Sequence, residues 1–113
     1  MTGRIWRFEI DAARAGEFER YAGGVALPLV ETRMGCSAVF ALRTPGIPRY
    51  AWTVFWVSRK AMAFTLASSE WDGVRREFAR FGASLETEES ELYETFSTFQ
   101  AGEKADAPSA PRS

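Results

Sequence analysis

The first candidate residues for chemistry in this sequence are a charged pair near the N-terminus. Arg7 and Glu9 alternate along a predicted strand, so their side chains point to the same face. If that face looks into a cavity, the pair would anchor a ligand or act as general acid and base. If the face is exposed, the pair would form cross-strand ion pairs instead. Both interpretations remain open from the sequence.

Aromatic residues form the second candidate group. Trp52 and Trp56 share one row of a predicted strand, where they would line a planar ligand or belong to the core or a dimer interface. Tyr50 and Tyr93 would donate a proton, orient a phenolic substrate or serve as interface tyrosines. We therefore predict a catalytic set of Arg7, Glu9 and Tyr93, and a substrate-binding set of Tyr50, Trp52 and Trp56.

Two residue types that are absent narrow the chemistry. The 113 residues include no His and no Asn. This excludes a His-ligated haem, a His-containing zinc site and any Ser-His or Cys-His nucleophile. Cys36 has no partner for an internal disulfide and is expected to be a small buried side chain. The glutamates between 86 and 91 lack the spacing of a calcium loop, and we predict that they form a solvated connector. We predict no cofactor and no metal.

Composition and charge restrict the partners and the compartment. The formal net charge of −1 gives no reason to expect binding to nucleic acid or to an anionic membrane. No apolar run approaches the length of about 18 residues that is needed to span a bilayer. A single cysteine favours a reducing compartment, and we expect a cytoplasmic protein.

The periodicity of the apolar residues predicts four strands and three helices. Alternation indicates strands over residues 4–10, 36–43, 50–57 and 91–99. Apolar residues at helical spacing begin near residue 18, and a kink is expected at Leu27-Pro28 before the helix continues to Met34. Ser58 is predicted to cap a helix that runs through Ala67. A last helix is expected to start at Ser69, with Asp72 completing a capping box, and to end at Gly82.

This element order, β-α-β-β-α-α-β, predicts the ferredoxin-like α+β fold, in which helices cover one face of a four-stranded antiparallel sheet. Residues 1–100 form one domain in this interpretation, and residues 101–113 form a disordered tail rich in Ala, Pro and Ser.

The third strand favours a homodimer because it is apolar on both sides. Tyr50, Trp52, Val54 and Trp56 form one row, and the residues between them form the other. Helices can cover only one row. Leaving three or four large side chains bare would forgo about 1.5–3 kcal/mol each, a sum comparable to the stability of a whole domain. A second copy of the chain is the common way to cover such a face. The alternative is that the C-terminal tail folds over the face, which its polarity disfavours.

Short motifs in this order resemble the dimeric α+β barrel superfamily. Trp56-Val57-Ser58 is similar to the antibiotic-biosynthesis-monooxygenase-like group, and Leu27-Pro28-Leu29 and Ser69-Glu70-Trp71 are similar to NIPSNAP-like domains. The remaining pieces are Ile5-Trp6, Gly16-Glu17-Phe18 and Gly35, so the resemblance extends from Arg4 to Phe99.

The resemblance implies a cavity between the sheet and the helices, or between two packed sheets, that holds a small hydrophobic molecule. It also implies that cofactor-free members oxidise an electron-rich substrate that itself activates oxygen. Haem-degrading members use an Asn, a Trp and a haem-ligating His, of which this chain has only the Trp. Two hypotheses follow. One is a cofactor-independent monooxygenase-like or isomerase-like enzyme acting on a small aromatic or hydrophobic compound. The other is a non-catalytic dimeric module binding a small hydrophobic ligand or a protein.

Overall fold

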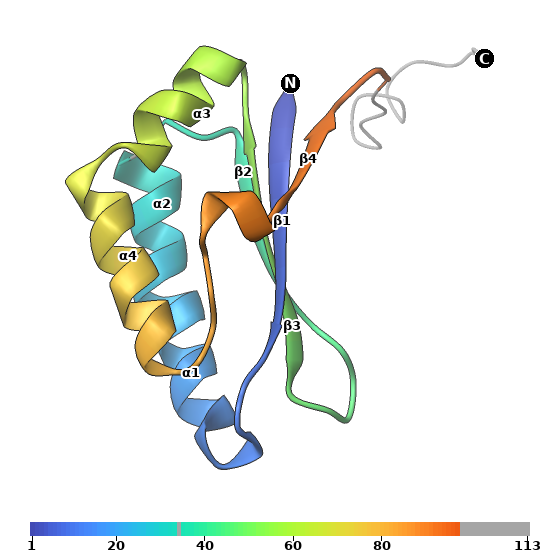
Figure 1. Cartoon of the computed structure of the whole chain (residues 1–113), viewed down its shortest axis with the longest axis vertical. Helices are drawn as coiled ribbons and strands as arrows, with labels where there is room; N and C mark the ends of the chain where they lie inside the picture. The colour runs from blue at the N-terminus through green and yellow to red at the C-terminus, as the bar shows by residue number, and fades with distance from the viewer. Residues whose placement is uncertain (34, 98–113) are drawn as a thin grey trace, which may run out of the picture.

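The helices of this protein lie on one side of a four-stranded sheet (Figure 1). The computed structural model describes residues 1–33 and 35–97. Its strands are β1 (Thr2–Glu9), β2 (Ala38–Arg43), β3 (Arg49–Trp56) and β4 (Glu91–Glu94). Their order across the sheet is β2-β3-β1-β4, and each neighbouring pair is antiparallel. This confirms the predicted ferredoxin-like arrangement. The predicted tail at 101–113 lies outside the described residues.

The helical elements also follow the predicted order. They are α1 (Ala15–Tyr21), the π turn η2 (Ala22–Ala26), α2 (Leu27–Arg33), α3 (Arg59–Leu66) and α4 (Ser69–Arg80). Short 3-10 turns, η1 (Ala12–Arg14) and η3 (Thr87–Glu89), precede α1 and β4. Within the described residues, no helix combines the length and the apolar character needed to cross a membrane.

The irregularity in the first helix lies earlier than predicted. The sequence placed a kink at Leu27-Pro28, but the structure has the π turn just before it, where the Leu27 N–H donates to the Ala22 carbonyl. Pro28 has no N–H, and its ring would clash with the carbonyl four residues back in a regular helix. Such kinks commonly coincide with a widened turn, and the helical path here continues to Arg33. Gly35 follows at φ 63°, as expected for a helix stop.

Several predicted strand boundaries were wrong. β1 starts at Thr2 rather than Arg4, and β2 starts at Ala38 rather than Cys36. β4 ends at Glu94, although the Thr95 N–H still donates to the Met1 carbonyl at 2.8 Å. The strand was predicted to reach Phe99, and residues 98 and 99 lie outside the described part of the chain.

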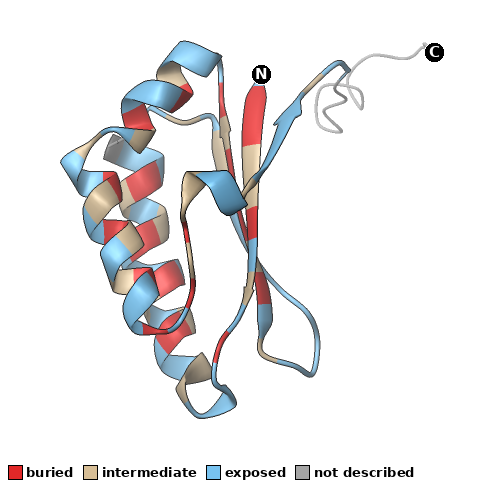
Figure 2. Ribbon diagram, viewed as in Figure 1, coloured by how far each residue is buried: buried red, intermediate tan, exposed pale blue. Residues whose placement is uncertain are grey.

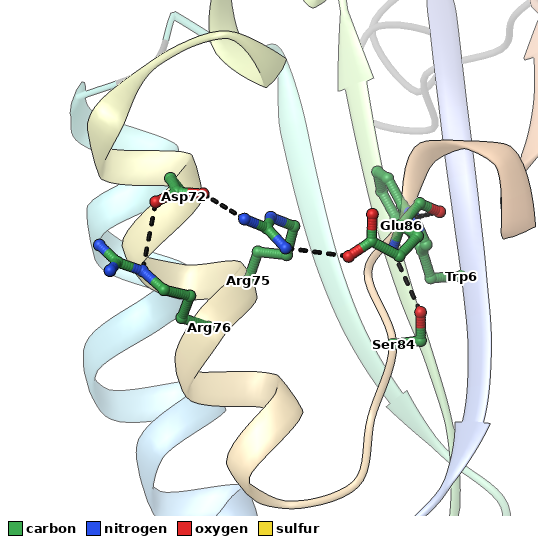
Figure 3. Close-up of polar contacts among 6 residues, drawn as sticks. All are labelled: Trp6, Asp72, Arg75, Arg76, Ser84 and Glu86. Atoms are coloured by element: carbon green, nitrogen blue, oxygen red, sulfur yellow. Dashed lines mark hydrogen bonds and ion pairs between the residues drawn. The ribbon is translucent and has the colours of Figure 1, made fainter.

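The cap of α4 is the other correction. Ser68, rather than Ser69, accepts the Trp71 N–H on its side-chain oxygen at 3.1 Å. Asp72 is therefore displaced from the capping-box position, and its carboxylate instead pairs with Arg75 and Arg76 (Figure 3). Ser58 caps α3 as predicted, and Gly82, at φ 88°, follows the end of α4.

An ion-pair chain ties the 83–90 connector to α4 (Figure 3). Arg75 bridges Asp72 on its own helix and Glu86 on the connector, with 2.9 Å between the Arg75 Nη1 and Glu86 Oε2 atoms. The Trp6 indole N–H donates to the Glu86 carbonyl at 3.1 Å. Trp6 also lies 5.2 Å from the Trp71 ring, measured between centroids. The connector is thus held on both sides, which keeps the sheet and α4 at a constant separation.

The core lies between the helices and one row of side chains on the two central strands, β1 and β3 (Figure 2). On β3 this row is Tyr50, Trp52, Val54 and Trp56, each at most 7% exposed. Trp6 pairs with Trp52 in the β1–β3 register and shares their face. The sequence could not say which row of β3 faces the helices, and the structure settles that it is the row with the two tryptophans.

Candidate functional site

A groove of about 410 Å³ lies where α1 and the π turn pass over the β2–β3 hairpin. This volume lies in the range of small-molecule sites. The helical side of the groove contributes Phe18, Glu19, Ala22 and Gly23, and the hairpin side contributes Ala41, Leu42, Arg43 and Tyr50. Aromatic rings line part of it, since the Phe18 and Tyr50 centroids are 5.0 Å apart. We call this cleft the Tyr50 groove.

Three polar side chains meet in the Tyr50 groove. The Tyr50 hydroxyl donates to the Glu19 carboxylate at 2.7 Å, and Arg43 donates to the other oxygen of that carboxylate at 2.7 Å. Arg43 and Tyr50 are cross-strand partners in the hairpin, so both side chains point to the helix side. Glu19 comes from α1, one residue after the buried Phe18. The carboxylate is therefore held by one neutral and one charged donor.

These contacts shift two ionisation equilibria in opposite directions. The hydrogen bond from Tyr50 lowers the pKa of Glu19, and the contact with Arg43 adds to this effect against the opposing effect of burial. Burial raises the pKa of Tyr50 to about 12, and the hydrogen bond to the negative Glu19 carboxylate adds to the shift. At neutral pH the site therefore holds an ionised carboxylate and a neutral phenol.

Titration of the tyrosines tests this arrangement. The folded-state pKa of Tyr50 lies above that of a free phenol, about 10. Its contribution to stability should then be complete below pH about 10 and be lost as the pH rises toward 12. Absorbance near 295 nm should show a tyrosinate step near pH 12 that Tyr50→Phe removes. Glu19→Gln should move that step to lower pH, because the negative acceptor is gone. An unmoved step would contradict the assigned hydrogen bond.

Trp52 lines a small void beside the Tyr50 groove and is not among the residues that line the groove itself. A void of about 10 Å³ shares five lining residues with the groove and adds Phe8, Ala51 and Trp52. Trp52 is only 1% exposed, yet its indole N–H donates to no atom among the described residues. Buried polar groups are nearly always paired, so this donor, buried beside the groove, is an exception.

Trp56 behaves differently from Trp52 although the two share a row. Its indole N–H donates to the Thr65 hydroxyl on α3 at 2.9 Å, in a fully buried contact. It lies outside the lining of the Tyr50 groove. The prediction that Trp56 binds substrate stays untested, and its observed contacts are those of a core residue.

The three residues predicted to be catalytic lie on the opposite face of the sheet. Arg7 pairs with Glu91 of β4 at 3.1 Å, and Tyr93 donates to the same Glu91 oxygen at 3.2 Å. The hydrogen bond with Glu91 raises the pKa of Arg7. Glu9 pairs with Arg49 of β3 at 2.8 Å. The structure thus gathers Arg7 and Tyr93 around Glu91 and keeps Glu9 in a separate cross-strand pair. Their catalytic role stays a prediction, and it would need a site on this open face.

Sequence reasoning missed Glu19, Arg43 and Gly23 as members of the groove. Arg43 could have been found, because it flanks the predicted turn opposite Tyr50 and a hairpin makes them neighbours. Glu19 carried no comparable signal, since its contact with Tyr50 spans 31 residues of chain. Cys36, half-buried, lies outside the groove, and burial raises the pKa of its thiol.

Comparison with known proteins identifies solved structures that share this fold. No protein-family model and no curated protein matches the sequence. A proposed antibiotic biosynthesis monooxygenase from Deinococcus radiodurans is similar in structure, with a TM-score of 0.73 and 13% identity over 88% of this chain and 97% of that one. HapK from Hahella chejuensis has a TM-score of 0.72 and 20% identity, over 89% of this chain and 98% of that one.

A third solved structure has a described activity. A variant of SnoaB from Streptomyces nogalater, a cofactor-independent oxygenase, has a TM-score of 0.68 and 18% identity over 86% of this chain and 94% of that one. The likeness to NIPSNAP-like domains stays a prediction. At these identities the match concerns the arrangement of elements, and it confirms the fold that the sequence resemblance implied. The chain has the ferredoxin-like fold shared by proteins of the antibiotic-biosynthesis-monooxygenase type.

Proposed function

We propose that this protein is a cytoplasmic homodimer that binds a small, electron-rich aromatic compound in the Tyr50 groove and oxidises it without a cofactor. The observation that carries the proposal is an aromatic groove that adjoins a small void lined by Trp52, whose buried indole N–H has no partner among the described residues. The likeness in fold to a cofactor-independent oxygenase supports the type of reaction. The single cysteine supports a reducing compartment.

The residues of the groove suit such a reaction. The substrate is the reductant and molecular oxygen is the oxidant, so a methylene group becomes a carbonyl, and the second oxygen atom leaves as water with the two hydrogens. The Trp52 N–H would hold a substrate oxygen on which negative charge develops. Glu19 would accept a hydrogen bond from a substrate hydroxyl, and the neutral Tyr50 would keep that carboxylate in place.

We infer the homodimer from the open face of the sheet, which is the face that carries no helix. This face presents Phe55 of β3, half-buried, beside Phe40 and Leu42 of β2, which are 49% and 50% exposed. Thr53, the partner of Phe40 in the register, is already buried among them. An apolar sheet face of this kind is typical of a surface between two copies. In a dimer, Arg7 and Tyr93 would face the space between the two sheets.

A second candidate function is binding without catalysis. The observation that favours it is the lowered pKa of Glu19, which makes this carboxylate a weak base for removing a substrate proton. The non-catalytic dimer would bind the same class of aromatic ligand in the same groove.

Turnover of anthrone separates the two candidates. Anthrone has an activated methylene and yields anthraquinone and water with one molecule of oxygen. We expect the native protein to raise its oxidation rate about 100-fold over the spontaneous rate, measured with an oxygen electrode and by absorbance. Glu19→Gln should lose most of that gain, and Arg59→Gln, on α3 away from the groove, should keep it.

Binding of anthrone under nitrogen without faster oxidation in air would overturn the oxygenase and support the second candidate. Absence of binding as well would overturn both.

A further inference from the structure

The π turn η2 contains two adjacent glycines, Gly23 and Gly24, at positions where the folded chain does not require glycine. Neither has the positive φ that would demand it, since the positive values belong to Gly35, Gly46 and Gly82. A Cβ atom built on either glycine meets nothing within 4 Å. Glycine inside a helical segment is nevertheless less stable than alanine. A reason for glycine must therefore come from outside the packing of the chain itself.

The two glycines differ in one respect. Gly23 lines the Tyr50 groove, beside Glu19 and across from Tyr50, and Gly24 does not. Both are exposed. The open space in front of Gly23 is therefore at the wall of the groove that adjoins the small void lined by Trp52. π turns occur frequently at functional sites in helices, where they widen the backbone locally.

We propose that Gly23 determines the specificity of the groove, because its missing side chain lets a multi-ring ligand pack directly on the backbone of the π turn. The inference rests on the proposed function and adds an upper limit on the size of the ligand that the groove accepts. A methyl group at position 23 would project into the groove and narrow it from the helix side. Ligands with fewer rings would still enter, and ligands with more rings would be excluded.

The test uses two aromatic probes of different width and matched variants of the neighbouring glycines. Binding of 2-naphthol, with two rings, and of anthrone, with three, is measured under nitrogen for native protein, Gly23→Ala, Gly23→Leu, Gly24→Ala and Gly24→Leu. Both alanine variants should melt a few degrees higher than native protein, because each replaces a helical glycine. This common gain shows that the fold is intact before affinities are compared.

We expect Gly23→Ala to weaken anthrone binding about tenfold and 2-naphthol binding less than threefold, a difference of about 0.7 kcal/mol or more between probes. Gly23→Leu should weaken both. Both Gly24 variants should bind both probes as native protein does. If Gly23→Ala binds anthrone with native affinity, or if the Gly24 variants lose as much, the role of Gly23 is overturned while the groove remains the binding site. If native protein binds neither probe, the proposed function itself fails.

Discussion

Replacing Phe55 with aspartate is expected to turn a dimer into a folded monomer. Phe55 lies on the open face of the sheet, and its ring crosses over β1 so closely that a Cβ on Gly3 would stand 2.5 Å from it. A second copy on this face would bury the ring. Burying an unpaired carboxylate there would cost several kcal/mol, so we expect the dissociation constant to rise at least about 100-fold. The free protomer loses little, because position 55 is half-exposed in it.

Light scattering after gel filtration at micromolar concentration measures this effect. Native protein should have twice the chain mass of 12.6 kDa, and Phe55→Asp should have the chain mass with an unchanged circular dichroism spectrum. Phe64→Asp is the matched control, since Phe64 is 76% exposed on α3 and away from the open face. Leu42→Asp repeats the test on β2. A native protein that runs as a monomer, or a Phe55→Asp variant that stays dimeric, would contradict the assignment of the interface.

Strand alternation made most of the sheet predictable from the sequence. A strand places successive side chains on opposite faces, so the rows of β3 follow from reading every second residue from Tyr50. The turn residues between Arg43 and Tyr50 indicated the hairpin, which also paired those two side chains. What alternation leaves undecided is which row meets the helices, because both rows of β3 are apolar.

The angular position of each side chain around a helix axis explains why the helical residues of the Tyr50 groove could not be predicted. Successive helical residues are about 100° apart, so one position decides whether a side chain faces the sheet or solvent. Glu19 reaches Tyr50 only because α1 docks with Phe18 inward. The π turn further changes the angular position of the side chains that follow it, and the pattern of apolar residues does not reveal this change. The adjacent Ser68 and Ser69 at the start of α4 pose a similar problem, which the contact of the Ser68 side chain with the Trp71 N–H resolves.

The aromatic row of β3 contains two tryptophans, one with the contacts of a core residue and one that we propose binds a ligand. Trp52 and Trp56 lie four residues apart, and both are at most 1% exposed. A tryptophan on such a row is equally compatible with packing and with binding. The two residues differ in the partner of the indole N–H, and the partner of Trp56 lies on α3, which the sequence of the strand does not contain. Trp56 has Thr65, and Trp52 has no partner among the described residues.

Trp52→Phe and Trp56→Phe should therefore have unequal effects although they remove the same atoms. Trp56→Phe loses a buried hydrogen bond and leaves a cavity, and we expect it to lower the free energy of unfolding by about 2–4 kcal/mol. Trp52→Phe also leaves a cavity, but it removes a donor whose burial without a partner costs about 1–3 kcal/mol. Its net loss should be at most about 2 kcal/mol. Urea unfolding monitored by circular dichroism measures both.

Ligand binding should show the reverse order. Trp52→Phe should weaken anthrone binding about tenfold or more, because a ligand that reaches the void beside the groove loses the Trp52 donor. Trp56→Phe should bind anthrone with native affinity at a temperature where it is folded, since its ring lies outside the groove lining. If Trp52→Phe is as destabilised as Trp56→Phe and binds normally, the Trp52 N–H serves the fold. The groove would then lose its proposed hydrogen-bond donor, and Glu19 would remain as its polar contact for a ligand.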